Sequence, residues 1–201
     1  HDQALENFQK ALNIQLKHLE PNHPVVAVSY QRIGEVYQAQ EEHDHALENF
    51  QKALDISLKN LEPDDPVVAI SYNAIGLVYH NKDEYDQALE YYQKALDIRL
   101  KQLGSEHPLV VESYSNFGWV YQAQGEHDQA LENFQKALDI ELKNLEPDHP
   151  DVAESHNAIG LVYRDKDEHD KALENFQKAL DIQLKNLEPD HPDVAISYNA
   201  I

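Results

Sequence analysis

Apolar residues recur along this chain at gaps of three and four positions, in blocks that short polar segments separate. Such gaps place apolar side chains on one face of a helix. In the block that follows Pro24, this face consists of Val26, Ala27, Tyr30, Ile33, Gly34 and Tyr37. In the next block it consists of Ala46, Leu47, Phe50, Ala53, Leu54, Leu58 and Leu61. The pattern predicts two amphipathic helices joined by the polar turn of residues 39–43.

This two-helix pattern repeats with a period of 42 residues. A proline opens each copy: Pro24, Pro66, Pro108, Pro150 and Pro192. A glycine follows ten residues later in each complete copy: Gly34, Gly76, Gly118 and Gly160. A fixed period of this size is typical of a solenoid, in which each copy packs only on its neighbours. We therefore expect an all-α fold in which antiparallel helix pairs stack into one elongated domain.

The period divides the chain into six segments. Residues 1–23 form a half repeat with a second helix only, residues 24–65, 66–107, 108–149 and 150–191 form complete repeats, and residues 192–201 begin a further repeat. Terminal repeats of a solenoid usually carry a polar cap, and neither end of this sequence has one. We expect apolar surface at both ends and end-to-end stacking through it. Because the chain has no methionine and opens within a repeat, we also expect it to be a segment of a longer protein.

Particular residues mark the expected helix ends. Pro24 suits the first turn of a helix, where its missing N–H is not needed. Asp44 is expected as an N-cap or a first-turn acid of the second helix. The second helix ends before Glu62-Pro63, because a residue that precedes proline is pushed out of the α region. Gly34 lies within the first helix, where glycine costs about 1 kcal/mol, so its recurrence predicts a close approach of the second helix.

The chain is strongly acidic, with 37 acidic residues, 16 basic residues and a formal net charge of −21. This balance argues against duplex DNA, whose phosphates attract Lys and Arg, and against anionic lipid. It favours a neutral or basic, apolar protein partner, although an acidic surface also simply keeps a repetitive protein in solution. No cysteine is present, which excludes disulfides and thiolate metal sites. No signal peptide and no apolar run of about 18 residues is found, and we expect a cytoplasmic protein.

The repeated residues resemble the tetratricopeptide repeat signature. The first copy reads Tyr30-x-x-Ile33-Gly34-x-x-Tyr37 and then Ala46-x-x-x-Phe50-x-x-Ala53, and the pattern recurs in register in four copies. The 42-residue form, with openings such as His149-Pro150-Asp151-Val152-Ala153, resembles the repeats of kinesin light chains and nephrocystin-like proteins. The resemblance implies a right-handed superhelix whose concave groove is lined by the first helix of each pair. It also implies peptide binding in that groove, without catalysis or a cofactor.

The resemblance transfers groove positions to this chain by their distance from the helix glycine. Three residues before the glycine stand Gln31, Asn73, Ser115, Asn157 and Asn199. One residue after it stand Glu35, Leu77, Trp119 and Leu161. Four residues after it stand Gln38, His80, Gln122 and Arg164. Six residues before it, the groove is extended by Ile70 and Ile196.

These positions suggest a class of ligand. An asparagine amide can both donate to and accept from an extended peptide backbone. Leu77, Trp119 and Leu161 can form an apolar strip, and tryptophan supplies disproportionate binding energy at interfaces. The alternatives are polar residues without a ligand, and leucines that tilted helices bury in the core. No lysine stands at the main groove positions, which argues against a C-terminal carboxylate as ligand. Glutamates at or near the groove argue against an acidic peptide: Glu35, Glu112 and Glu154.

The twelve histidines do not predict a metal site. Four of them precede the helix prolines of successive copies: His23, His107, His149 and His191. The repeat spaces these side chains apart, whereas zinc needs about four ligands around one point. No Gly-rich phosphate loop, nucleophile elbow or His-Glu-x-x-His motif is present. The sequence therefore predicts a non-catalytic protein–protein interaction scaffold that binds an extended peptide or a partner helix. The alternative is a self-associating array or spacer that stacks end to end.

Overall fold

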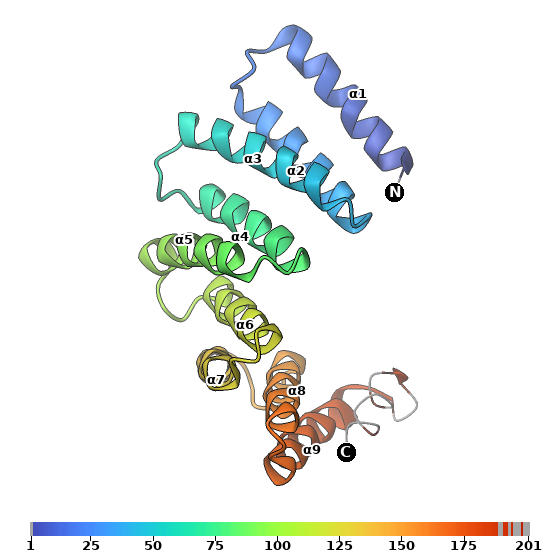
Figure 1. Cartoon of the computed structure of the whole chain (residues 1–201), viewed down its shortest axis with the longest axis vertical. Coiled ribbons are helices and arrows are strands. Elements are labelled where there is room, and N and C mark those ends of the chain that lie inside the picture. The colour runs from blue at the N-terminus through green and yellow to red at the C-terminus, as the bar shows by residue number, and fades with distance from the viewer. Residues whose placement is uncertain (1, 189–190, 193, 195–197, 199–201) are drawn as a thin grey trace. The chain divides into compact units, whose positions relative to one another are not determined.

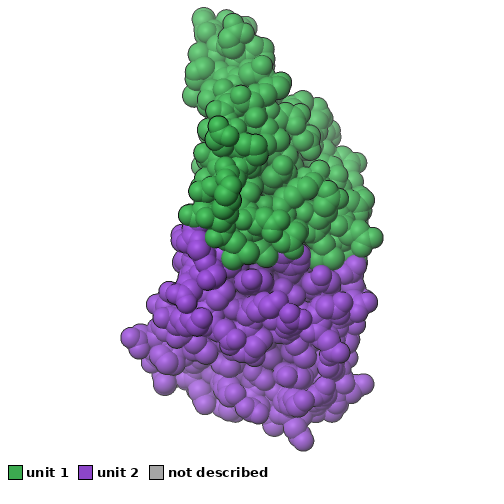
Figure 2. All heavy atoms as spheres, turned by 90° about the vertical axis from the view of Figure 1, so that its left-hand side faces the viewer, with its two compact units in different colours: residues 1–102 green, residues 103–201 purple. Residues whose placement is uncertain are grey.

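The computed structural model describes residues 2–188, 191, 192, 194 and 198, and within these residues the secondary structure is helical, with no strand (Figure 1). The helices are α1 (Asp2–His18), α2 (Pro24–Ala39), α3 (His43–Asn60), α4 (Pro66–Asn81), α5 (Tyr85–Leu103), α6 (Pro108–Ala123), α7 (His127–Asn144), α8 (Pro150–Asp165) and α9 (His169–Asn186). The chain separates into two compact units, His1–Gln102 and Leu103–Ile201 (Figure 2). The predicted all-α repeat solenoid is confirmed.

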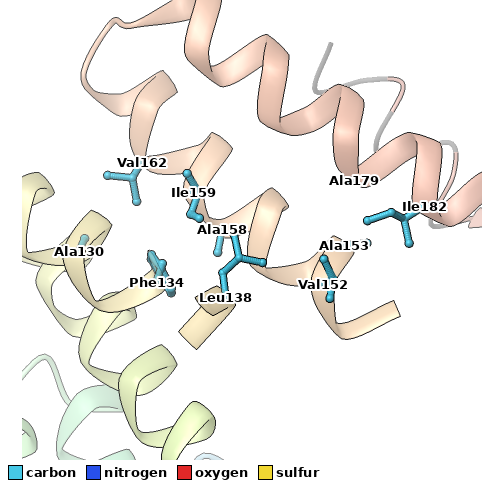
Figure 3. Close-up of a cluster of buried hydrophobic side chains, with 10 residues drawn as sticks. All are labelled: Ala130, Phe134, Leu138, Val152, Ala153, Ala158, Ile159, Val162, Ala179 and Ile182. Atoms are coloured by element: carbon cyan, nitrogen blue, oxygen red, sulfur yellow. The ribbon is translucent and has the colours of Figure 1, made fainter. Parts of the chain in front are cut away.

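Successive helices pack side by side within each unit. In the first unit α1 packs on α2, α2 on α3, and α3 on α4; in the second, α6 packs on α7, α7 on α8, and α8 on α9. α4 contacts α5 through the stacked rings of Tyr79 and Tyr91, whose centroids are 5.5 Å apart. In the second unit, Phe134 and Leu138 of α7 belong to the same buried cluster as Ile159 of α8 (Figure 3). Within each unit, neighbouring helix pairs thus bury apolar faces against each other, as expected of a solenoid.

The helix glycines lie against aromatic rings of the second helices. A Cβ built on Gly34 would lie 2.6 Å from Cε1 of Phe50. A Cβ on Gly118 would lie 2.6 Å from Cε1 of Phe134. Carbon atoms pack at about 3.5–4.0 Å, so only glycine lets the ring approach the first helix so closely. The predicted close approach is confirmed.

The first helices begin at the repeated prolines, and the residue before each proline is their N-cap. Nδ1 of His23, His107 and His149 accepts a hydrogen bond from the backbone N–H two residues later, at 3.3, 3.1 and 3.2 Å. Asp65 makes the same bond through Oδ1 at 2.9 Å. Such a cap satisfies one of the donors that a helix start leaves free. The sequence reasoning gave these histidines no role, and their role is structural.

The polar turn between α2 and α3 forms as predicted. Glu41 in this turn has a φ of 59°, and Gly125 at the equivalent position has a φ of 75°. Of the two roles expected for Asp44, the first-turn acid is observed, because the N-cap is Glu42. The Asp44 carboxylate accepts a hydrogen bond from Nζ of Lys82 at 2.7 Å. This bond connects the start of α3 to the residue that caps the end of α4.

Candidate functional site

Two equivalent grooves lie between successive first helices, one in each unit. Each has the second helix of the earlier pair as its floor and a volume of about 370 Å³. The groove of the first unit, here called the apolar groove, is lined by Pro24, Ala27, Val28, Gln31, Ala53, Ile56, Ser57, Asn60, Leu61, Val67, Ile70 and Ser71. The groove of the second unit, here called the acidic groove, is lined by Pro108, Val111, Glu112, Ser115, Trp119, Phe134, Glu141, Asp151, Glu154, Ser155 and Ala158. Both grooves are open concave surfaces, of a size that takes a peptide side chain or a small ligand.

The apolar groove exposes aliphatic side chains from both of its walls. Val28 of α2 is 59% exposed and Ile70 of α4 is 49% exposed. Gln31 is the polar member of the α2 wall. Its Nε2 donates to Glu35 at 3.3 Å, while its Oε1 is buried and accepts no hydrogen bond. This groove therefore combines apolar surface with an unused hydrogen-bond acceptor.

The acidic groove has the same backbone frame and a different lining. At the positions of Val28 and Ile70 it carries glutamates, and at the positions of Ser57 and Val67 it carries Glu141 and Asp151. Its lining includes no lysine or arginine among the described residues. Trp119 is 39% exposed. The indole packs edge-on against the Phe134 ring, with the centroids 4.9 Å apart.

Glu141 forms part of the floor of the acidic groove. Only 7% of its surface is exposed. The Ser155 hydroxyl donates a hydrogen bond to its carboxylate, but Oε2 has no hydrogen-bond partner. Burial raises the pKa of Glu141, and the negative charges of Asp151 and Glu154 raise it further. The Ser155 hydrogen bond and the nearby His149 act in the opposite direction.

Four of the residues expected in the groove line these two hollows: Gln31, Ile70, Ser115 and Trp119. Four half-buried residues lie outside both grooves: Asn73, Leu77, Asn157 and Leu161. Leu77 belongs to the first unit, and Trp119 and Leu161 belong to the second. Asn199 and Ile196 lie outside the described residues.

The remaining expected residues make contacts of their own near the helix ends. Glu35 is exposed and pairs with Arg32 at 2.9 Å. The His80 ring lies 6.1 Å from the Tyr85 ring, and burial lowers the pKa of His80. Two of them share Asp165 as a partner: Nε2 of Gln122 donates to it at 2.9 Å, and Arg164 pairs with it at 3.1 Å.

The sequence reasoning missed the floor of the grooves, which the second helices supply. The missed position is marked by a variable residue inside an almost constant block. Between a repeated Asp-Ile and a repeated Leu-Lys, the chain carries Ser57, Arg99, Glu141 and Gln183. Variation at one position of an otherwise repeated helix was the signal that could have identified it.

Neither a metal site nor a membrane-spanning helix is found among the described residues. In the described part of the chain, no three His, Asp or Glu side chains are grouped so that they could hold a metal ion. Among the same residues, every helix is too short or too polar to cross a lipid bilayer.

Family models and solved structures match the chain along most of its length. A family model described as tetratricopeptide repeat matches residues 1–59, 67–143, 120–185 and 151–201, and a second model with the same description matches residues 32–101. A search of curated proteins found no match. The chain is similar to the crystal structure of a Podosopora anserina putative kinesin light chain with nearly identical TPR-like repeats. The TM-score is 0.80, and the sequences are 26% identical over 93% of this chain and 89% of that one. It has the fold of BtubC (BKLC) from P. vanneervenii, with a TM-score of 0.78 and 23% identity over 92% of this chain and 73% of that one.

Proposed function

The chain belongs to the tetratricopeptide repeat family, and from that premise we propose that it is a non-catalytic scaffold that binds an extended peptide or a partner helix in the grooves between its first helices. The observation that carries the proposal is the pair of equivalent grooves. The helices that form the two grooves begin and end at equivalent positions and carry glycines at equivalent positions. The side chains that line the two hollows differ. Side chains that only maintained the fold would not need to change from hydrocarbon to carboxylate at matching positions.

The apolar groove supports recognition of an aliphatic side chain. Val28, Val67 and Ile70 offer hydrocarbon from two helices to the same hollow. Complete burial of one aliphatic side chain contributes roughly 1.5–3 kcal/mol. The free Oε1 of Gln31 offers an acceptor to a peptide N–H beside it. An apolar side chain followed by extended backbone would use both features.

The proposed partner is a protein or peptide that is apolar and neutral or basic. The net charge of −21 repels acidic partners and attracts basic ones. Nucleic acid, lipid and cofactors are not among the proposed ligands. The proposal places this interaction in the cytoplasm. The asparagines and leucines next to the helix glycines remain proposed contacts for the parts of the ligand that extend beyond the two hollows.

A matched pair of variants on α2 tests this proposal. Val28 lines the apolar groove, and Val25 is also exposed on α2 but lies outside the groove. A labelled decapeptide library is titrated against wild type, Val28→Glu and Val25→Glu. We expect Val28→Glu to weaken binding of apolar peptides about tenfold and Val25→Glu to leave it unchanged. Equal loss in both variants, or no peptide binding to the wild type, would falsify the proposal.

A self-associating array is the second candidate function, and one feature of α1 favours it. Ile14 is 60% exposed, whereas the equivalent Ile56 is 6% exposed because α3 is covered by neighbouring helices. Exposed hydrocarbon of this kind favours contact with a second copy. Sedimentation velocity at rising concentration distinguishes the candidates. A mass that grows with concentration and falls in Ile14→Lys supports the array, and a constant monomer excludes it.

A further inference from the structure

Glu141 is a buried carboxylate with only part of its hydrogen-bonding capacity used. Ser155 donates to the carboxylate, and Oε2 has no partner. A buried carboxylate is costly unless its oxygens are paired or hydrogen-bonded. The equivalent residue of the apolar groove, Ser57, is also buried. The fold therefore does not itself require a carboxylate at this position.

Asp151 and Glu154 add negative charge around Glu141, and the described lining of the groove includes no lysine or arginine. Three more carboxylates line the same groove: Glu112, Asp151 and Glu154. The nearby His149 uses Nδ1 to accept the N–H of Asp151 at 3.2 Å. That nitrogen consequently carries no proton with which to pair a carboxylate. Like charges around one hollow repel one another, and a cation that enters from outside would relieve this repulsion.

We infer that the acidic groove binds a lysine or arginine side chain of the peptide partner, with Oε2 of Glu141 as the acceptor at the bottom of the hollow. The inference rests on the proposed function, and it names the chemistry that one of the two grooves recognises. The ammonium or guanidinium group donates to Glu141, and Asp151 and Glu154 supply the surrounding negative charge. The two grooves then select different residues, an aliphatic side chain in the first unit and a basic one in the second.

The rings in the acidic groove suit an organic cation. Trp119, which packs against the buried Phe134 ring, supplies aromatic surface along the groove. Aromatic rings attract ammonium and guanidinium groups, and they also cover the methylene stems that carry such groups. A metal ion is disfavoured, because in the described residues these carboxylates do not form a group of three or more ligands around one point.

Peptide pools that differ in one residue test the inference with the full chain. The pools are acetylated and amidated decapeptides, random in alanine, leucine, valine and serine. Their fixed central residue is lysine, arginine, norleucine or glutamate. Binding is measured by fluorescence polarisation of labelled peptides at physiological ionic strength. Trp119, the single tryptophan of the chain, reports the acidic groove through its own emission.

Two isosteric variants separate the groove from the overall charge. Glu141→Gln keeps the size of the side chain and removes its charge. Glu146→Gln also removes one charge, at an exposed position between α7 and α8 that lies outside the groove. This control is needed because a net charge of −21 attracts basic peptides to any part of the surface. Circular dichroism is used to check that both variants keep the helical content of the wild type.

We expect the lysine and arginine pools to bind the wild type at least tenfold more tightly than the norleucine and glutamate pools. Glu141→Gln should remove this preference, because losing one partner of a buried charge pair has an effect of that size or larger, and Glu146→Gln should retain it. Equal binding of the lysine and norleucine pools, or a preference that survives in Glu141→Gln, overturns the inference and leaves peptide binding intact. Failure of every pool to bind overturns both the inference and the proposed function.

Discussion

Replacing Gly118 with alanine tests the packing that creates the groove frame. In an exposed helix this change would stabilise the protein by about 1 kcal/mol, because alanine is the better helix former. Here the new Cβ would lie 2.6, 2.7 and 2.7 Å from three ring atoms of Phe134. Those separations are about 1 Å shorter than normal carbon contacts. The Phe134 ring is 1% exposed and packs against Trp119, so it has little room to move.

The net effect follows from these two opposing contributions. Overpacking a tight core costs about 1–3 kcal/mol, and three simultaneous overlaps place Gly118→Ala at the upper end of that range. After the gain in helix propensity is subtracted, we expect the free energy of unfolding to fall by roughly 2 kcal/mol. Urea unfolding followed by circular dichroism and by Trp119 emission measures this loss.

A double-mutant cycle shows whether the ring is the cause. Phe134→Leu removes the ring edge that the new methyl group would meet, so Gly118→Ala should be less destabilising in that background than in the wild type. Gly125→Ala serves as a comparison, since no atom lies within 4 Å of its Cβ and its cost arises from a φ of 75°. A neutral or stabilising Gly118→Ala, or an equal effect in both backgrounds, would refute the reasoning.

Three further substitutions test individual features. In the folded state, burial raises the pKa of Glu141. Its carboxyl group therefore stabilises the protein most when it is protonated. This stabilisation is lost as the pH rises from the ordinary range of glutamate through the raised pKa. Glu141→Gln should therefore be more stable than the wild type by roughly 1 kcal/mol at neutral pH, with the difference vanishing in acid, as measured by urea unfolding between pH 3 and pH 8; a difference that does not depend on pH contradicts this account. His107→Asp should stabilise by about 0.5 kcal/mol, because Asp65 makes the same cap and an anion suits the helix N-terminus; a lower thermal midpoint would contradict it. Glu41→Gly should stabilise by about 1 kcal/mol by relieving the positive φ that Gly125 adopts in the equivalent turn, and an unchanged unfolding midpoint would show that the turn is not strained.

The fold follows closely from the sequence because its determinants are local and repeated. Spacing of apolar residues gives the helices, and the proline positions give the starts of α2, α4, α6 and α8. The recurrence of Gly34 and its equivalents predicts the close contact with the second helix. Each of these features depends on residues within one repeat or between adjacent helices, where the sequence pattern is sufficient.

The candidate site was only partly predictable because it depends on the direction of single side chains. Glu141 stands next to Ile140 in a helix that the apolar pattern assigned to the core. Neighbouring residues in a helix point about 100° apart, so one of them packs in the core while the other reaches the groove floor. Similarly, the recurrence of His107 was visible, but its hydrogen bond to the Leu109 N–H depends on cap geometry. Asp44 lies in the first turn of α3 as expected, but its hydrogen bond to Lys82, which joins it to the next helix pair, was not predictable from its own helix.

The most direct test of the account is to locate a bound peptide on the chain. A binding decapeptide that carries photoleucine is cross-linked to the full protein, and the modified residues are identified by mass spectrometry. We expect cross-links to groove residues such as Val28, Ile70, Trp119 and Ala158. Cross-links confined to apolar side chains outside the grooves, such as Leu173 of α9, would contradict the claim that the hollows between the first helices are the binding surface.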